Sequence, residues 1–138
     1  PIWFVEGGAE FMAQTASQRL RESGVLTASD WNPLADRMTW TMEEVRYWMS
    51  SNPETSASQI QYGPDQGIAY SYGSWAHAWL ADRFGPDALL DSYYPRLNDL
   101  GFEGAFQHTY EMSTAEFIAE FDQFVLLPIQ EQLQILPG

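Results

Sequence analysis

The chain has 138 residues, of which 45% are hydrophobic and 15% aromatic, so we expect one globular domain and not a disordered segment. Nineteen acidic residues against six basic ones give a formal net charge of -13, which would repel nucleic acids and anionic membranes, so we expect neither as a partner. Cysteine is absent and no apolar run approaches the roughly 18 residues of a membrane-spanning helix, which excludes disulfides, thiolate ligands and membrane insertion.

The first stretch, residues 2 to 22, has apolar positions at helical spacing. They recur every three or four residues: Ile2, Val5, Ala9, Met12, Ala13, Ala16 and Leu20. This period is typical of an amphipathic helix, and Gly24 is placed to cap its end. Two carboxylates, Glu6 and Glu10, lie one turn apart beside the stripe, where buried charge needs a partner or a metal.

Two glycines make the same stretch unusual. Gly7 and Gly8 fall inside the expected helix, where each costs roughly 1 kcal/mol relative to alanine. The close approach of a neighbouring helix would explain them. Two interpretations of the acids stay open at this point: a core helix whose carboxylates meet arginines elsewhere, or a functional site.

The segment from residue 29 to residue 68 reads as two helices followed by a loop. Pro33 suits the first turn of a short helix near residues 33 to 38, and Thr41 to Glu44 is a capping-box pattern that predicts a longer helix near residues 42 to 51. Residues 52 to 68 are polar and contain two prolines and two glycines, which predicts a loop. A loop of this length is either a lid or substrate-facing rim, or a plain surface excursion.

Residues 70 to 84 form the clearest helix of the sequence. Its apolar positions share one face: Tyr72, Trp75, Ala76, Trp79, Leu80 and Phe84. A second face carries Tyr70, Gly73 and His77, so we expect this helix to be buried on two sides. We expect His77 to be a hydrogen-bonded core or pocket histidine and not a metal ligand.

The remaining chain also has helical periodicity. Helices are expected from Pro86 to Gly101, with a kink at Pro95, then over residues 103 to 110, and after a capping box at Ser113. No stretch alternates with period two for long enough to predict a strand. We therefore predict an all-α bundle of about six helices, with residues 1 to 126 as one helical subdomain and residues 127 to 138 as a tail or short helix.

The N-terminal run W-F-V-E-G-G-A-E resembles the W-x-x-E-G-x-A-E segment of gluzincin zinc metallopeptidases, which include aminopeptidase N-like and peptidase MA-like domains. In that family an H-E-x-x-H helix supplies two histidines and a general base, and a following helix supplies the third zinc ligand. The resemblance implies that Glu6 is this ligand and that Glu10 supports it. These 138 residues contain no H-E-x-x-H motif, and the only histidines, His77 and His108, lie 31 positions apart.

A second match lies at the start of the residue 70 to 84 helix. Tyr70-Ser71-Tyr72-Gly73 is similar to the aminopeptidase N-like pattern Y-x-K-G, in which the first tyrosine donates a hydrogen bond to the oxyanion of the tetrahedral intermediate. The resemblance implies this role for Tyr70, which follows Glu6 by 64 positions, a separation similar to that of the family. Tyr72 stands where the aminopeptidases have lysine.

A third match is A-F-Q-H-T-Y-E-M-S-T-A-E-F, which is similar to the family's C-terminal A-F-x-x-x-T-G-x-S-x-x-E-F, with Glu111 in place of glycine. The resemblance thus covers most of residues 1 to 125. It implies the C-terminal helical subdomain of a zincin catalytic domain, the half that follows the H-E-x-x-H helix. Gly7, Gly73 and His77 would then support the site.

The resemblance implies zinc and a peptide or protein substrate in the parent protein. We expect no zinc on this chain alone and no activity, because one carboxylate cannot hold a catalytic zinc. The alternative is a free-standing, non-catalytic helical module that binds a partner through the groove once used for catalysis. In a fragment, the face carrying Glu6 and Tyr70 would promote self-association.

The compartment of the protein is left undetermined by the sequence. No signal peptide precedes Pro1, but a chain that starts with proline inside a motif is expected to have lost its natural start. The missing signal therefore predicts nothing about localisation.

Overall fold

The structure, a computed structural model, describes residues 1–27 and 29–137, and these residues contain helices but no β-strand. The elements follow in this order: α1 (Ile2–Glu22), α2 (Leu34–Ser51), η1 (Ala57–Gln59), α3 (Gln66–Phe84), η2 (Leu89–Tyr93), α4 (Tyr94–Tyr110), α5 (Thr114–Phe124), α6 (Ile129–Gln132) and η3 (Leu133–Ile135). The predicted all-α class is confirmed.

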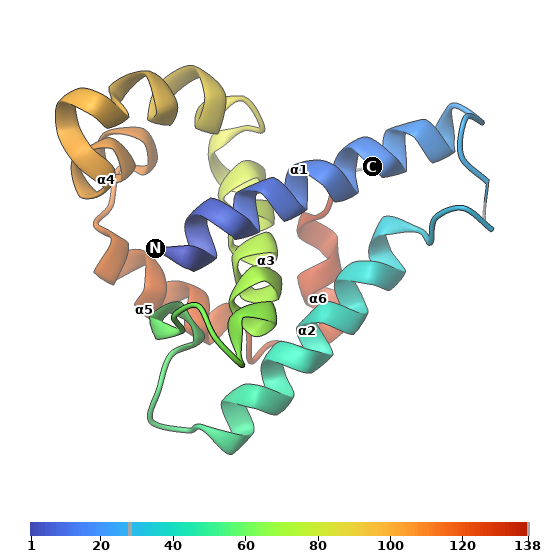
Figure 1. The fold of residues 1–138 in the computed structure, drawn as a ribbon, viewed down its shortest axis with the longest axis horizontal. Coiled ribbons are helices and arrows are strands. Elements are labelled where there is room, and N and C mark those ends of the chain that lie inside the picture. The colour runs from blue at the N-terminus through green and yellow to red at the C-terminus, as the bar shows by residue number, and fades with distance from the viewer. Residues whose placement is uncertain (28, 138) are drawn as a thin grey trace.

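Helix α3 lies at the centre of the molecule. Figure 1 shows α1 crossing α3, with α2 on one side and α4 and α5 on the other. Every residue from 71 to 78 is buried, as the two faces of this helix predicted. Because α3 is covered on several sides, its position determines where the other helices lie.

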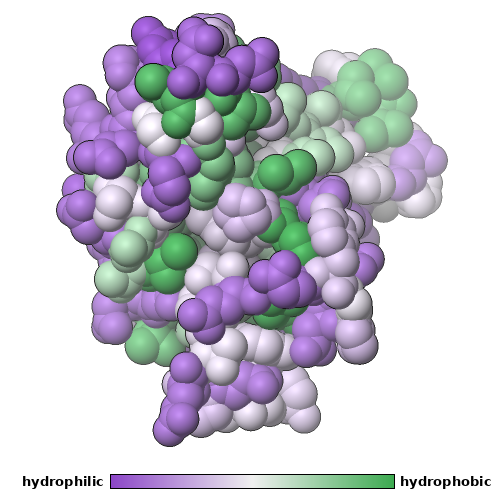
Figure 2. All heavy atoms as spheres, turned by 60° about the vertical axis from the view of Figure 1, so that its left-hand side comes forward, coloured by the Kyte–Doolittle hydropathy of each residue, from purple (hydrophilic) through white to green (hydrophobic). Residues whose placement is uncertain are grey.

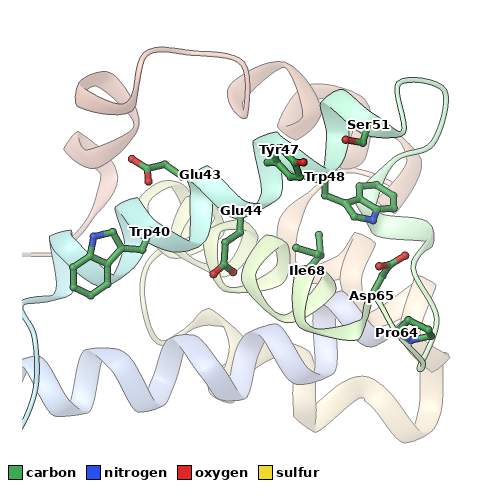
Figure 3. Close-up of a pocket in the computed structure, with 9 residues that line it drawn as sticks. All are labelled: Trp40, Glu43, Glu44, Tyr47, Trp48, Ser51, Pro64, Asp65 and Ile68. Atoms are coloured by element: carbon green, nitrogen blue, oxygen red, sulfur yellow. The ribbon is translucent and has the colours of Figure 1, made fainter.

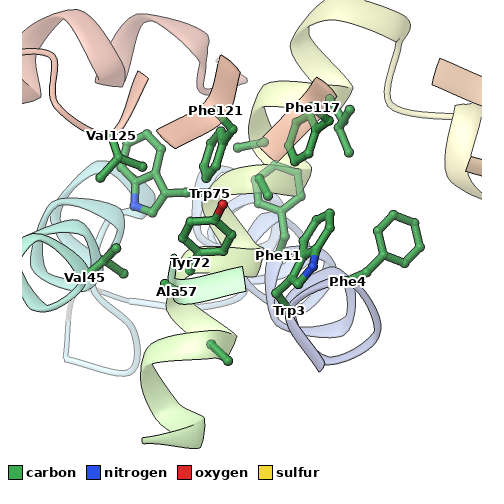
Figure 4. Packing of buried hydrophobic residues seen from close by; sticks show 14 of the residues in the cluster. Trp3, Phe4, Phe11, Val45, Ala57, Tyr72, Trp75, Phe117, Phe121 and Val125 are labelled. Atoms are coloured by element: carbon green, nitrogen blue, oxygen red, sulfur yellow. The ribbon is translucent and has the colours of Figure 1, made fainter. Parts of the chain in front are cut away.

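The core around α3 is largely aromatic (Figure 4). Trp3 of α1 stacks on Phe117 of α5 with a centroid separation of 5.5 Å, and Phe117 stacks in turn on Phe121 at 5.4 Å. Trp3 also meets Tyr72 of α3 edge-on at 6.2 Å. Such pairs contribute about 0.5–1.5 kcal/mol each beyond area burial, so they join three helices that are distant in the sequence.

The buried face of α1 is not the one that its apolar stripe predicted. Of that stripe only Ile2 is buried, and the other members are exposed: Val5, Ala9, Met12, Ala13, Ala16 and Leu20. The helix instead buries its aromatic and glycine face: Trp3, Phe4, Gly7, Gly8 and Phe11, together with Gln14. Hydrophobic stabilisation grows with the apolar area buried, so the face with three aromatic rings is preferred over one of alanines and single aliphatic chains.

The prediction of two helices between residues 33 and 51 is wrong, because α2 is continuous from Leu34 to Ser51. Thr41 does not cap a helix; its hydroxyl donates to the carbonyl oxygen of Met38 at 2.9 Å within α2. Met38, Met42 and Val45 form one buried face at helical spacing across the expected break, and this packing outweighs the local capping pattern.

The loop before α3 is shorter than predicted, because α3 begins at Gln66 rather than near residue 70. It contains the short 3-10 turn η1, whose Ala57 is buried in the core. The loop is therefore anchored at η1 and at the buried Ile60, and residues 61 to 65 after it are all exposed.

The C-terminal half contains the expected irregularities. A π-helical turn, η2, ends two residues before Pro95, which has no backbone N–H to donate and whose ring crowds the carbonyl of the preceding turn. Within α4, Gly101 has φ 70° and ψ 178°, a conformation available essentially to glycine alone, and it breaks the helix where the sequence predicted an end. Ser113 and Glu116 form the predicted capping box of α5.

The surface is mixed in character. On the face shown in Figure 2, hydrophobic residues lie as patches among hydrophilic ones. Among the residues that the structure describes, no helix combines the length and the apolar character needed to cross a membrane.

Candidate functional site

The candidate site is built on the crossing of α1 and α3. A β-carbon added to Gly7 would lie 2.3 Å from the Cα atom of Gly73, so the two helix backbones touch at this point. No side chain other than hydrogen fits between them. This contact is the close backbone approach that the glycines of α1 suggested.

Glu6 lies at the edge of this crossing, directly before Gly7, and is partly exposed. The hydroxyl of Tyr62 donates a hydrogen bond to Oε1 of Glu6 at 2.7 Å. Tyr62 belongs to the loop between η1 and α3, so this loop reaches back to α1. The hydrogen bond holds one carboxylate oxygen of Glu6.

Tyr70 lies on α3, one turn before Gly73, and is also partly exposed. The pKa of Tyr62 is raised above its usual value, mainly by the hydrogen bond to Glu6, then by burial and by the charges of Glu6 and Tyr70. Because Gly73 contacts Gly7, Tyr70 lies one turn from the contact that Glu6 adjoins. We call Glu6, Tyr62 and Tyr70 the Glu6 patch.

His77 is a core residue held by α1. Its Nε2–H donates to the buried carbonyl oxygen of Phe4 at 2.7 Å, which fixes the tautomer because a carbonyl can only accept. Burial lowers the pKa of His77 to about 4, partly offset by the hydrogen bond to Phe4. A β-carbon added at Gly8 would lie 3.0 Å from this nitrogen, so Gly8 makes room for the ring.

The other titratable residues singled out in the sequence do not belong to the Glu6 patch. Glu10 follows Glu6 by one turn, and its Oε1 accepts a long hydrogen bond of 3.4 Å from Gln14. His108 is exposed on α4. Within residues 1–27 and 29–137, no group of three or more histidine, aspartate or glutamate side chains is arranged to hold a metal. A zinc ion at Glu6 would therefore need its remaining ligands from elsewhere.

A second surface feature lies between α2 and the start of α3. It is a groove of about 670 Å³, shown in Figure 3. Its lining combines aromatic, acidic and small residues: Trp40, Glu43, Glu44, Tyr47, Trp48, Ser51, Pro64, Asp65 and Ile68. We call it the α2 groove. Since its last three residues follow Tyr62 closely, the groove and the Glu6 patch share one connecting loop.

Neither Tyr62 nor the α2 groove was predicted from the sequence. Tyr62 is a single tyrosine in a polar loop, and no spacing links it to Glu6, which lies 56 positions earlier. The groove combines residues of α2 with Pro64, Asp65 and Ile68, which lie at the end of the following loop and the start of α3. The sequence pointed to this region only through the long loop, for which a lid or substrate-facing rim and a plain surface excursion were both left open.

No family model matches the chain, and neither the curated proteins nor the solved structures contain a significant match to it.

Proposed function

We propose that the chain is the helical part of a gluzincin-type zinc metallopeptidase, in which Glu6 is a zinc ligand and Tyr70 stabilises the oxyanion during peptide-bond hydrolysis. One observation carries this proposal. Glu6 and Tyr70 are 64 positions apart in the sequence, yet Glu6 adjoins Gly7 and Tyr70 lies one turn before Gly73, so both flank the Gly7–Gly73 contact. A shared location is what their proposed roles require.

The side chains suit these roles. Tyr62 engages Oε1 of Glu6, which orients the carboxylate and leaves Oε2 for a metal. A phenol donates a hydrogen bond without carrying charge, and removing one oxyanion donor typically costs about 3 kcal/mol in the transition state. Bound zinc would supply the Lewis acid for hydrolysis of the peptide bond.

The two histidines and the general base would come from an H-E-x-x-H segment outside these 138 residues. The exposed apolar stripe of α1 supports this part of the proposal, because two of its members, Val5 and Ala9, lie within one turn of Glu6 and are exposed. An additional helix packed there would bury apolar surface and bring its own side chains beside Glu6.

The test is zinc content and peptidase activity of the full-length gene product. Glu6→Gln should lose most of the zinc, while Glu22→Gln, an exposed acid on the same helix, should keep it. Tyr70→Phe should keep zinc and lower kcat by about 100-fold with little change in the free energy of unfolding. Unchanged zinc in Glu6→Gln, or equal losses of activity and stability in Tyr70→Phe, would contradict the proposal.

Calorimetry on residues 1–138 provides a second test. We expect no tight zinc binding, because a catalytic zinc site takes three protein ligands and the described residues place only Glu6 at this position. Tight binding by this chain alone would show that its residues assemble a different metal site.

The alternative is a non-catalytic helical module that binds a partner. The α2 groove favours it, because exposed aromatic side chains around a groove are typical of binding surfaces. A full-length gene product that lacks an H-E-x-x-H segment and carries no zinc would favour this alternative.

A further inference from the structure

We propose that the α2 groove binds an arginine-containing peptide segment in an extended conformation. The groove is lined by three aromatic and three acidic side chains, and none of its lining residues is basic. Trp40 and Tyr47 have 49% and 77% of their surface exposed, which is unusual for large aromatic residues. The inference concerns a surface apart from the proposed zinc ligand and does not depend on it.

The lining residues of α2 form one face of the helix. Trp40, Glu44 and Trp48 follow one another at intervals of four residues; Trp40 and Glu44 are exposed, and Trp48 is partly buried against the core. In Figure 3, Trp40 and Trp48 lie at the two ends of the row. In the same view, Ile68 of α3 has the carboxylate of Glu44 on one side and that of Asp65 on the other. Along α2 the lining thus passes from an aromatic side chain through two acidic ones to two further aromatic ones.

A groove lined by aromatic and acidic side chains favours a guanidinium group as its ligand. Arginine stacks its planar guanidinium on aromatic faces and pairs with carboxylates at the same time, whereas the compact ammonium of lysine has no flat face to stack and makes cation–π contacts less often. The protein itself uses the first arrangement twice: Arg37 lies 4.0 Å from the ring centroid of Trp31, and Arg83 lies 4.8 Å from that of Trp79. No such partner covers Trp40 or Trp48 among the described residues.

The spacing of the groove suits an extended peptide. Residues four apart on a helix are separated by about 6 Å along its axis. Alternate side chains of an extended strand are separated by about 6.8 Å. Arginines at every second position of a peptide would therefore reach Trp40, Glu44 and Trp48 in succession, with Asp65 on the opposite wall.

The experiment measures fluorescence anisotropy of a labelled peptide, Gly-Arg-Gly-Arg-Gly-Arg-Gly, titrated with the protein at 0.15 M salt. At this ionic strength the screening length is about 8 Å, so distant charges contribute little. We expect a Kd below about 1 mM for the arginine peptide. The matching lysine peptide should bind several-fold more weakly, and the glutamate peptide should not bind.

Two exposed residues of the groove provide variants that should still fold. Trp40→Gln and Glu44→Gln should each weaken binding by about twofold to fivefold, and the double variant by about tenfold. Glu131→Gln, an exposed acid of α6 with the same effect on net charge, is the matched control and should leave Kd unchanged. Far-UV circular dichroism checks that all variants remain helical.

Several results would overturn the inference. These are no binding of the arginine peptide up to about 1 mM, equal binding of the lysine or glutamate peptide, no effect of the groove variants, or an effect of Glu131→Gln as large as that of Glu44→Gln. The last would mean that the net charge of -13 attracts the peptide without a site. Because no metal takes part, each of these outcomes leaves the zinc proposal to its own tests.

Discussion

Gly73 of α3 lies directly against the backbone of Trp3 of α1: a β-carbon added to Gly73 would lie 1.8 Å from the carbonyl oxygen of Trp3. The neighbouring atom belongs to a helix backbone and cannot turn aside as a flexible side chain would. The contact therefore sets the distance between the two helices. It also determines where Glu6 and Tyr70 lie, because each belongs to the same or the adjacent turn of its helix.

We predict that Gly73→Ala lowers the free energy of unfolding by at least about 3 kcal/mol, because the methyl group forces α1 and α3 apart and disrupts the core around Trp3. Gly67→Ala is the control. It lies on the same helix with no atom within 4 Å of the added carbon, and it should be neutral or stabilise by up to about 1 kcal/mol. Urea denaturation followed by circular dichroism measures both.

Substitutions on the two faces of α1 should differ in how much stability they cost. Phe11, with 8% of its surface exposed, packs in the core, so Phe11→Ala should cost about 3–5 kcal/mol of stability. Met12, with 44% exposed, belongs to the apolar stripe, and Met12→Gln should change stability by less than about 0.5 kcal/mol. Urea denaturation measures the free energy of unfolding of both variants. A larger loss of stability in Met12→Gln would show that the apolar stripe is covered.

The buried His77 should make the protein less stable in mild acid. Its pKa falls from 6.5 to about 4 on folding, mainly through burial, so the unfolded state binds a proton more readily between these values. Stability is therefore lost as pH falls below 6.5, by about 2 kcal/mol between pH 7 and pH 5.

The matched variant is His77→Gln, which keeps a hydrogen-bond donor but does not titrate in this range. Its free energy of unfolding should fall less than that of the wild type over the same pH interval, as measured by urea denaturation at each pH. Parallel pH profiles of the two proteins would mean that His77 titrates normally in the folded state.

Buried tyrosines should limit stability in alkali. Burial, followed by the nearby Tyr93 and Tyr94, raises the pKa of Tyr110, so its phenol resists ionisation in the folded state while the unfolded state ionises near pH 10. Stability is thus lost as pH rises above 10, by about 1 kcal/mol for this residue up to pH 11. Tyr110→Phe should reduce the loss, and Tyr47→Phe, which removes an exposed phenol, should not.

Much of the helical structure was predictable because it depends on local signals. The capping box at Ser113, the bounds of α1 and the break at Gly101 each follow from residues adjacent in the sequence. The same reasoning failed at Thr41, where a local capping pattern lies inside a longer helix. There the buried face that contains Met38 and Met42 contributes more than the local preference.

The candidate site was predicted only in part. The cost of glycine in a helix predicted a close backbone approach at Gly7, but only the tertiary structure decided that the approaching backbone is that of Gly73. Tyr62 could not be found from the sequence, because its link to Glu6 arises from the path of a loop. The zinc ligand role of Glu6 and the oxyanion role of Tyr70 stay predictions.

The sequence by itself determined that the chain is all-α, acidic and free of disulfides, because helical periodicity, charge and cysteine content are properties of local segments and composition. Only the tertiary structure decided which face of α1 is buried, since that depends on the apolar surface that α3, α4 and α5 present to it. It likewise decided that His77 meets Phe4, and that Trp40 and Asp65 border one groove. Burial and hydrogen bonding act between residues far apart in the chain, and no local pattern specifies such pairs.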